Sequence, residues 1–288
     1  MKNYGGLTRE FSGKDNSEIV IIPVPYDETS TWIKGSDKGP DAIIEASANM
    51  ELYDIETGTE VYRRGILTDK PVSTKSSPEE MSGAVFERVS GYLEKGIFPV
   101  VVGGEHSVSI GSIQACAAYH SGLSVLQLDA HSDLRDEYEG SKYNHACVMA
   151  RAREVAPIIQ VGIRASDSEE LALLDTKRVF FAHQIQDDDN WMRRAVDLLT
   201  GNVYITIDLD VFDPSIMPST GTPEPGGMGW YQCMTLLKKV ISDKNLVGFD
   251  VVELCPSESN RAPDFMAAKL IYRLLSMQYA KTDNKLKL

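Results

Sequence analysis

The chain has 288 residues, of which 42% are hydrophobic and 25% are charged, values typical of globular proteins that bury a substantial core. Its formal net charge of −13 argues against partners such as nucleic acid or anionic membrane, and mildly favours small cations as ligands. No apolar run approaches the ~18 residues that a membrane span needs, and the N-terminal segment is more polar than a signal peptide. We therefore expect a cytoplasmic protein.

The four cysteines lie far apart and form no CxxC pair, which argues against a zinc ribbon or a thioredoxin-type site. In the absence of an export signal, we expect all four to be reduced and mostly buried in the core. They are Cys116, Cys147, Cys233 and Cys255.

Short apolar segments rich in β-branched residues alternate with longer helix-like segments along the chain. They predict strands over 18–25, 96–104, 123–131, 157–164, 178–183, 202–210 and 245–254. Ser77 and Pro78 predict the start of a helix that ends at Gly96, and residues 262–280 predict an amphipathic closing helix. Strands that are apolar throughout and separated by helices indicate a mostly parallel sheet covered on both faces. We expect one α/β domain over residues 1–288.

Polar side chains with metal-binding chemistry follow the strand predicted near residue 125. Asp129, His131 and Asp133 occupy every second position, and residues two apart share a face of a strand. Ligands of such sheets bind beyond the carboxyl ends of the strands. The three side chains are therefore predicted to converge where the strand runs into its loop.

Other predicted strands end in the same kind of residue. Their ends carry Asp208 and Asp210, Glu105 and His106, and Asp250 and Glu253. Each alone is modest evidence, because a strand-end Asp is often a helix cap and a lone His is often structural. Clustered carboxylates about 4 Å apart would repel by ~4 kcal/mol per pair at an effective dielectric of 20, and two divalent cations would remove that repulsion.

The predicted ligand set is rich in oxygen, contains two imidazoles and has no thiolate. This composition disfavours structural zinc and suits manganese, with iron, cobalt or nickel as alternatives. Two ions bridged by aspartates would hold a water molecule and lower its pKa, which supplies hydroxide at neutral pH.

Motifs along nearly the whole chain resemble those of the ureohydrolases, the family of arginase and agmatinase, and agmatinases most of all. The main motifs are GGEHS (103–107), DAHSD (129–133) and TIDLDVFDP (206–214), supported by the segments 23–47, 135–151, 220–227 and 250–256. The resemblance implies an arginase-like, three-layer α/β/α fold, a homo-oligomer (trimer or hexamer), and two manganese ions per chain.

The resemblance also implies which side chains hold each ion. The ligands of one ion would be His106, Asp129, Asp133 and Asp208. Those of the other would be Asp129, His131, Asp208 and Asp210, so that two aspartates bridge the pair. Glu105 stands where many family members have aspartate. Agmatinase-like members also have glutamate at this position.

Two further residues carry catalytic roles by resemblance. His145 resembles the proton shuttle that would protonate the leaving amine, although a loop histidine can equally lack a role. Glu253 resembles the carboxylate that binds the substrate guanidinium, whose paired N–H donors suit a carboxylate, although it can also be a surface glutamate.

The implied reaction is hydrolysis of a small cationic guanidino substrate to urea and an amine. The loop around Arg135 resembles agmatinases rather than arginases, so we expect agmatine as substrate and putrescine as product. Asp167 could bind a substrate amino group or merely start a helix, and the segment 257–264 departs from the usual agmatinase pattern. Arginine and guanidinobutyrate therefore stay open as substrates.

Two alternative functions compete with that of a dinuclear ureohydrolase. A catalytically inactive, metal-binding homologue would be expected to lack at least one of the six ligands, and none is missing. A related deacetylase-type amide hydrolase would generally bind one zinc ion, which the second D-x-D pair at Asp208 and Asp210 argues against.

Overall fold

All strands in the described part of the chain belong to one eight-stranded sheet, and every pairing within it is parallel. The computed structural model describes residues 2–72 and 77–283. The strands are β1 (Ile19–Val24), β2 (Ile66–Thr68), β3 (Phe98–Gly103), β4 (Leu123–Leu128), β5 (Ile158–Ile163), β6 (Val179–Phe181), β7 (Asn202–Asp208) and β8 (Asn245–Val252). The seven predicted strands are confirmed, and β2 was not predicted.

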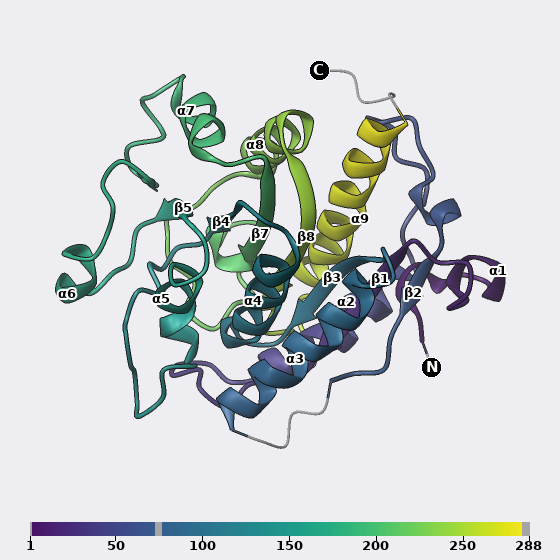
Figure 1. Cartoon of the computed structure of the whole chain (residues 1–288), viewed down its shortest axis with the longest axis horizontal. Helices are drawn as coiled ribbons and strands as arrows, with labels where there is room; N and C mark the ends of the chain where they lie inside the picture. The colour runs from purple at the N-terminus through teal and green to yellow at the C-terminus, as the bar shows by residue number, and fades with distance from the viewer. Residues whose placement is uncertain (1, 73–76, 284–288) are drawn as a thin grey trace.

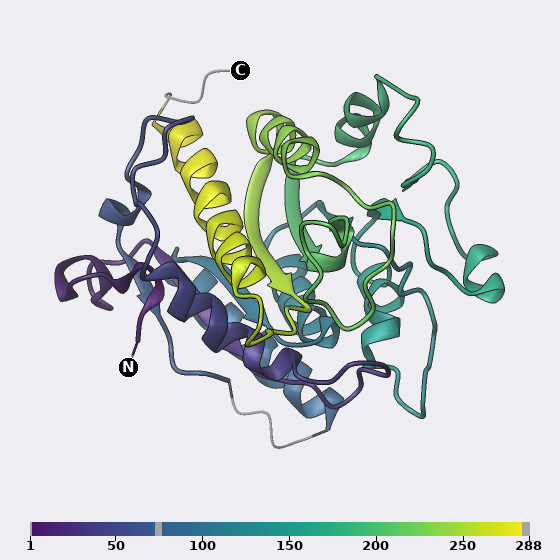
Figure 2. The same cartoon turned by 180° about the vertical axis from the view of Figure 1, so that it is seen from behind.

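Helices cover both faces of the sheet, which confirms the predicted three-layer α/β/α fold. They are α1 (Arg9–Ser12), α2 (Gly39–Ser47), α3 (Pro78–Leu93), α4 (Ser109–Tyr119), α5 (Val148–Ala152), α6 (Ser168–Leu171), α7 (Trp191–Leu198), α8 (Trp230–Asp243) and α9 (Ala262–Thr282). Figure 1 looks onto the face covered by α3 and α4. Figure 2 shows α2, α8 and α9 on the opposite face.

The strands are buried on both sides because alternate side chains enter two separate cores. In β1, Ile19 and Ile21 pack into the core beneath α2 and α9, whereas Val20 and Ile22 pack into the core beneath α3 and α4. Burial of both faces explains why these strands are apolar throughout rather than alternating.

Local signals set the helix boundaries that the sequence predicted. The Ser77 hydroxyl accepts a hydrogen bond from the Glu80 amide and caps α3, with Pro78 in its first turn. The closing helix extends to Thr282.

No helix in the described ranges is long and apolar enough to cross a bilayer. Three of the four free cysteines are buried, and Cys255 is partly exposed.

The strand order places the polar strand ends side by side. The order is β2-β1-β3-β8-β7-β4-β5-β6, so the four strands that carry the predicted site residues, β3, β8, β7 and β4, are consecutive in the middle of the sheet. Because all run in one direction, their carboxyl ends open at the same edge. The chain leaves β3 and resumes at β4 on the far side of β7 and β8, and such a reversal of strand order is where α/β sheets bind ligands.

Candidate metal centre

Close backbone packing brings the first histidine to the edge of the sheet. β3 ends at Gly103, and the next residue, Gly104, lies against the loop after β1, so closely that a Cβ atom there would lie 2.0 Å from the Tyr26 carbonyl oxygen. The chain then enters a short 3-10 helix, His106–Val108, that leads into α4. Only glycine permits this contact, and it fixes the backbone of His106 beside the loop after β1.

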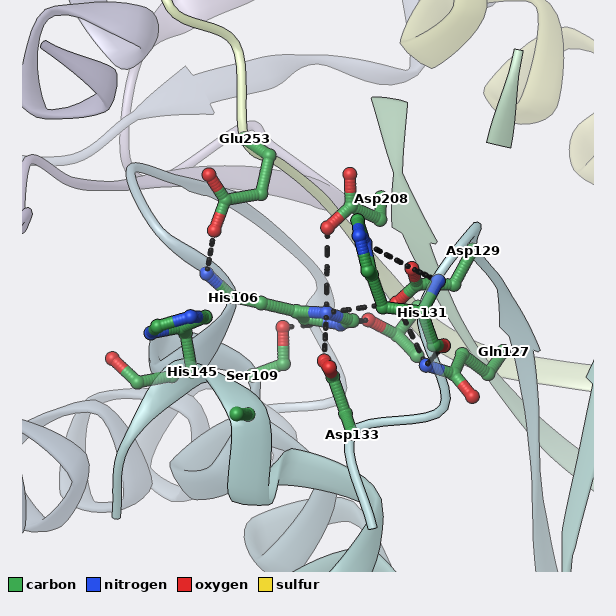
Figure 3. Close-up of polar contacts among 12 residues, drawn as sticks. His106, Ser109, Gln127, Asp129, His131, Asp133, His145, Asp208 and Glu253 are labelled. Carbon is green, nitrogen blue, oxygen red and sulfur yellow. Dashed lines mark hydrogen bonds and ion pairs between the residues drawn. The ribbon is translucent and has the colours of Figure 1, made fainter. Parts of the chain in front are cut away.

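Three carboxylates surround the imidazole of His106. Its Nδ1 atom lies 3.1 Å from an oxygen of Asp129, 2.9 Å from Asp133 and 3.5 Å from Asp208. Figure 3 shows these side chains converging on His106 from the ends of β4 and β7. Ligands bound ~2.1 Å from one ion at right angles to each other lie ~3 Å apart, so the spacing suits a single cation.

A second cluster adjoins the first. His131 Nδ1 lies 2.9 Å from Asp210 and 3.7 Å from Asp129. Possible ligand atoms of Asp129, His131 and Asp210 lie within 4.8 Å of one another, as do those of His106, Asp129 and Asp208. The structure thus brings all six predicted ligands together, with Asp129 common to both groups. Asp208 belongs only to the group with His106 and Asp129, and its predicted bridging role stays a prediction.

The hydrogen bonds of His106 test whether this site fits a cation. Its Nε2 atom lies 2.9 Å from the Thr206 hydroxyl, which donates to the buried Asp250 carboxylate at 2.6 Å. Thr206 therefore accepts the Nε2 proton, and this leaves the lone pair on Nδ1. Nδ1 is buried without a hydrogen-bond partner among the described residues and faces three carboxylate oxygens. The residues fit a divalent cation at this position.

The electrostatics of the cluster favour either protons or metal ions. Burial and the charge of Asp129 raise the pKa of Asp133 to about 6, and burial together with Asp210 and Asp129 raises the pKa of Asp208 well above its usual range. Burial disfavours charge on His106 and His131, but the surrounding carboxylates raise the pKa of both. Without cations the site holds protons, and those protons must leave when metal binds.

Sequence reasoning missed the glutamines that hold Asp129. Gln127 Nε2 donates to Asp129 Oδ2 at 2.7 Å, and Gln160 Nε2 donates to Gln127 Oε1 at 2.6 Å. Both are buried on the adjacent strands β4 and β5. A glutamine within an otherwise apolar strand was the available signal, because an amide is buried only when its hydrogen bonds are satisfied.

Glu253 lies at the end of β8, next to His106. Its backbone has a φ of 68°, a left-handed conformation that is uncommon for a residue with a side chain. Its carboxylate accepts a hydrogen bond from the His106 backbone amide at 2.7 Å, as Figure 3 shows. Burial and nearby Glu105 raise the pKa of Glu253 well above its usual range, so a cationic partner would stabilise the carboxylate form.

His145 lines the same pocket and begins the short 3-10 helix His145–Cys147, which leads into α5. Its Nδ1 atom is 3.1 Å from the Thr29 hydroxyl, which also accepts the His145 backbone amide at 3.0 Å. The Tyr138 ring packs edge-on against it, with centroids 6.2 Å apart. Burial, with the positive charges of His131 and His106, lowers the pKa of His145 to about 4, which favours the neutral imidazole.

Asp167 serves as the N-cap of α6. Its side chain accepts a hydrogen bond from the Glu169 amide, and the Glu170 side chain accepts one from the Asp167 amide, which together form a capping box. Asp167 also lines the pocket and lies 3.8 Å from Arg135. The structure therefore contains the helix-start arrangement, and a role in substrate binding stays a prediction.

A cavity of about 410 Å³ connects these residues. The residues that line it include His106, His131, Asp133, Asp208 and Asp210, together with Glu253 and His145. Trp32, whose side chain is 74% exposed, lies at the outer part of the lining and belongs to the loop after β1. The volume is in the range of small-molecule sites.

Comparisons with known proteins agree with this geometry. Residues 17–276 match the profile described as the arginase family. An N(1)-aminopropylagmatine ureohydrolase from Synechocystis is 38% identical, covering 90% of this chain and 89% of that protein. An agmatinase from Bacillus anthracis is 32% identical, covering 91% of this chain and 92% of that protein.

A solved structure matches almost the whole length of this chain. The agmatine ureohydrolase of Thermoplasma volcanium superposes with a TM-score of 0.89 at 30% identity, covering 99% of this chain and 96% of that one. The fold, the polar strand ends and this coverage together show that the chain belongs to the arginase family and is a ureohydrolase, a hydrolase of guanidino compounds.

Proposed function

We propose that the protein binds two divalent cations, manganese being the first choice, and hydrolyses the guanidinium group of agmatine to putrescine and urea. The observation that carries the proposal is a pair of imidazole–carboxylate clusters that share the buried Asp129 and whose other members line one pocket. The oxygen-rich donor set with two imidazoles suits manganese. An inactive homologue is disfavoured, because all six ligands are present and lie together.

The cations, when bound, would supply hydroxide at neutral pH and positive charge that stabilises a tetrahedral intermediate. Glu253 would bind the substrate guanidinium. Its Oε1 accepts the His106 amide, and Oε2 makes no hydrogen bond within the described residues, so it is free to accept a substrate N–H. This ion pair would orient the guanidinium carbon over the base of the pocket.

His145, whose lowered pKa favours the neutral ring, would take up a proton from solvent at Nε2 and pass it to the departing amine. An amine leaves readily only when protonated, and a histidine on the pocket wall can deliver that proton within hydrogen-bond reach. Because Nδ1 contacts Thr29, the atom available for this transfer is Nε2.

The pocket favours a substrate without a carboxylate. Arg135 is the one arginine or lysine of the described lining, and it is engaged by Glu170 at 3.3 Å and stacks over the Tyr138 ring at 4.2 Å. Asp167 and Glu224 add negative charge to the same lining. A carboxylate such as that of arginine or guanidinobutyrate would therefore meet a mostly acidic wall.

A longer polyamine is the second candidate substrate. Relatives at 38% and 37% identity, from Synechocystis and Thermus thermophilus, are N(1)-aminopropylagmatine ureohydrolases. An added aminopropyl arm would carry one more cation toward the acidic wall and the exposed Trp32 ring, which can bind an ammonium group through its face.

Urea release from manganese-loaded protein tests the proposal. The panel should include agmatine, N(1)-aminopropylagmatine, arginine and guanidinobutyrate, with Asp129→Ala as the negative control. We expect kcat/KM for the two agmatines to exceed that for arginine by at least ~10-fold, because arginine's carboxylate is repelled. Equal or better use of arginine would overturn the substrate assignment, and no urea from any substrate would overturn the activity.

A further inference from the structure

We propose that Thr29 and Glu105 form a positioning pair that fixes the tautomer of His145, so that Nε2 is the atom that exchanges protons with substrate. The inference rests on the proposed function of His145. It concerns the loop after β1 and the glutamate that replaces the family's usual aspartate in the GGEHS motif.

Glu105 is fully buried and surrounded by donors from two segments. One carboxylate oxygen accepts the backbone amides of Thr29 and Ser30 at 2.6 and 3.0 Å. The other accepts the hydroxyls of Thr29 and Ser107 at 2.5 and 2.6 Å. Every one of these partners donates, which is the pattern that a charged carboxylate requires.

The direction of these bonds determines the protonation of His145. The Thr29 hydroxyl hydrogen is directed to Glu105, so the Thr29 oxygen can only accept from its remaining neighbours. Those neighbours are the backbone amide and the Nδ1 atom of His145, at 3.0 and 3.1 Å. Nδ1 therefore carries a hydrogen, and Nε2 keeps the lone pair.

The replacement of aspartate by glutamate matters to this arrangement. The carboxylate must reach from the end of β3 to the backbone amides of Thr29 and Ser30. It must also accept a hydrogen bond from the Ser107 hydroxyl. An aspartate is one methylene shorter. Glu105 and Thr29 act through His145 and would touch neither substrate nor cation.

Kinetics of Thr29 variants in the metal-loaded enzyme test the inference. Thr29→Val removes the hydroxyl at nearly constant volume and should lower kcat by ~10–100-fold, with unchanged metal content. Thr29→Ser keeps the hydroxyl and should restore most of kcat. Thr200→Val is the matched control, since it removes a threonine hydroxyl that is hydrogen-bonded to the Asn202 carbonyl and to Ser124, outside the pocket lining, and kcat should stay near that of the wild type.

A double-mutant cycle separates this inference from the proposed function. With agmatine as substrate, Thr29→Val should have no further effect on kcat in a His145→Ala background. An equal effect in both backgrounds, or a normal kcat for Thr29→Val beside an impaired His145→Ala, overturns the positioning inference alone. A normal kcat for His145→Ala overturns the proposed role of His145 and the inference with it.

A measurement on the wild-type protein keeps the test independent of variant folding. Nitrogen-15 spectra of histidine-labelled protein loaded with diamagnetic zinc should show His145 at neutral pH with Nδ1 protonated and Nε2 unprotonated. The His145 signal is identified by its loss in His145→Ala. A neutral ring protonated at Nε2 would contradict the inference.

Discussion

At the scale of single residues, the site depends on side chains that orient the ligands as much as on the ligands themselves. Thr206 receives the Nε2 hydrogen of His106, and Asp250 receives the hydroxyl hydrogens of Thr206 and Tyr204, at 2.6 and 2.8 Å. Such partners fix the tautomer and direction of a metal-binding histidine.

Thr206→Val should therefore weaken manganese binding by ~10–100-fold at the ion held by His106. Isothermal titration calorimetry of metal-free protein provides the two dissociation constants. Thr206→Ser retains the hydroxyl and should bind both ions nearly as the wild type does. Unchanged affinities in Thr206→Val would show that the hydrogen bond to His106 does not contribute to binding.

The protonation of the cluster predicts that the stability of the metal-free protein depends on pH. In the metal-free protein, the pKa values of His106, His131 and Asp133 are raised, so the folded state binds more protons than the unfolded chain. The contribution of each histidine to stability is complete below its unfolded pKa and is lost as pH rises through the raised folded value. Ionising Asp133 likewise costs stability as pH rises toward about 6.

Manganese replaces those protons, so its stabilising effect should grow with pH. We expect the difference in Tm between metal-loaded and metal-free protein to increase from pH 5.5 to 8, and metal binding to release protons into the buffer. Calorimetry in buffers of different ionisation enthalpy counts the protons. A constant Tm difference without proton release would contradict the description of the cluster.

At the scale of elements, close packing at Gly104 joins the loop after β1 to the end of β3. A Cβ at Gly104 would overlap the Tyr26 carbonyl, whereas a Cβ at Gly83, an exposed position within α3, would meet nothing within 4 Å. Gly104→Ala should therefore destabilise the fold by more than ~2 kcal/mol.

Gly83→Ala is the matched control, and it should stabilise the protein by ~0.5–1 kcal/mol through higher helix propensity. Urea denaturation of both variants gives the free energies of unfolding. If Gly104→Ala were as stable as the wild type, the contact with Tyr26 would not constrain the loop.

The elements that the sequence predicted are those with a strong local signal. The seven predicted strands are mainly apolar segments, several of them rich in β-branched residues, and α3 has a serine cap followed by proline. β2 was missed because only two apolar residues, Ile66 and Leu67, stand between Gly65 and Thr68, whereas the equally short β6 lies within the apolar run 179–182. The bond between Thr29 and His145 joins residues 116 positions apart, and no local pattern records such a contact.

At the scale of the whole molecule, the strand order accounts for the site. Sequence spacing predicted that Asp129 and Asp208 end strands, but their adjacency follows from β4 and β7 being neighbours, which spacing alone does not determine. The resemblance to ureohydrolases supplied the grouping of ligands, and the fold and family are confirmed. The single domain, the cytoplasmic location and the trimer or hexamer remain predictions.

Anomalous X-ray scattering at the manganese edge, from crystals of manganese-loaded protein, tests the central claim most directly. The account predicts two peaks per chain. One should lie among His106, Asp129, Asp133 and Asp208, and the other among Asp129, His131, Asp208 and Asp210. A single peak, or peaks outside these side chains, would contradict a paired cation site at the carboxyl ends of β4 and β7.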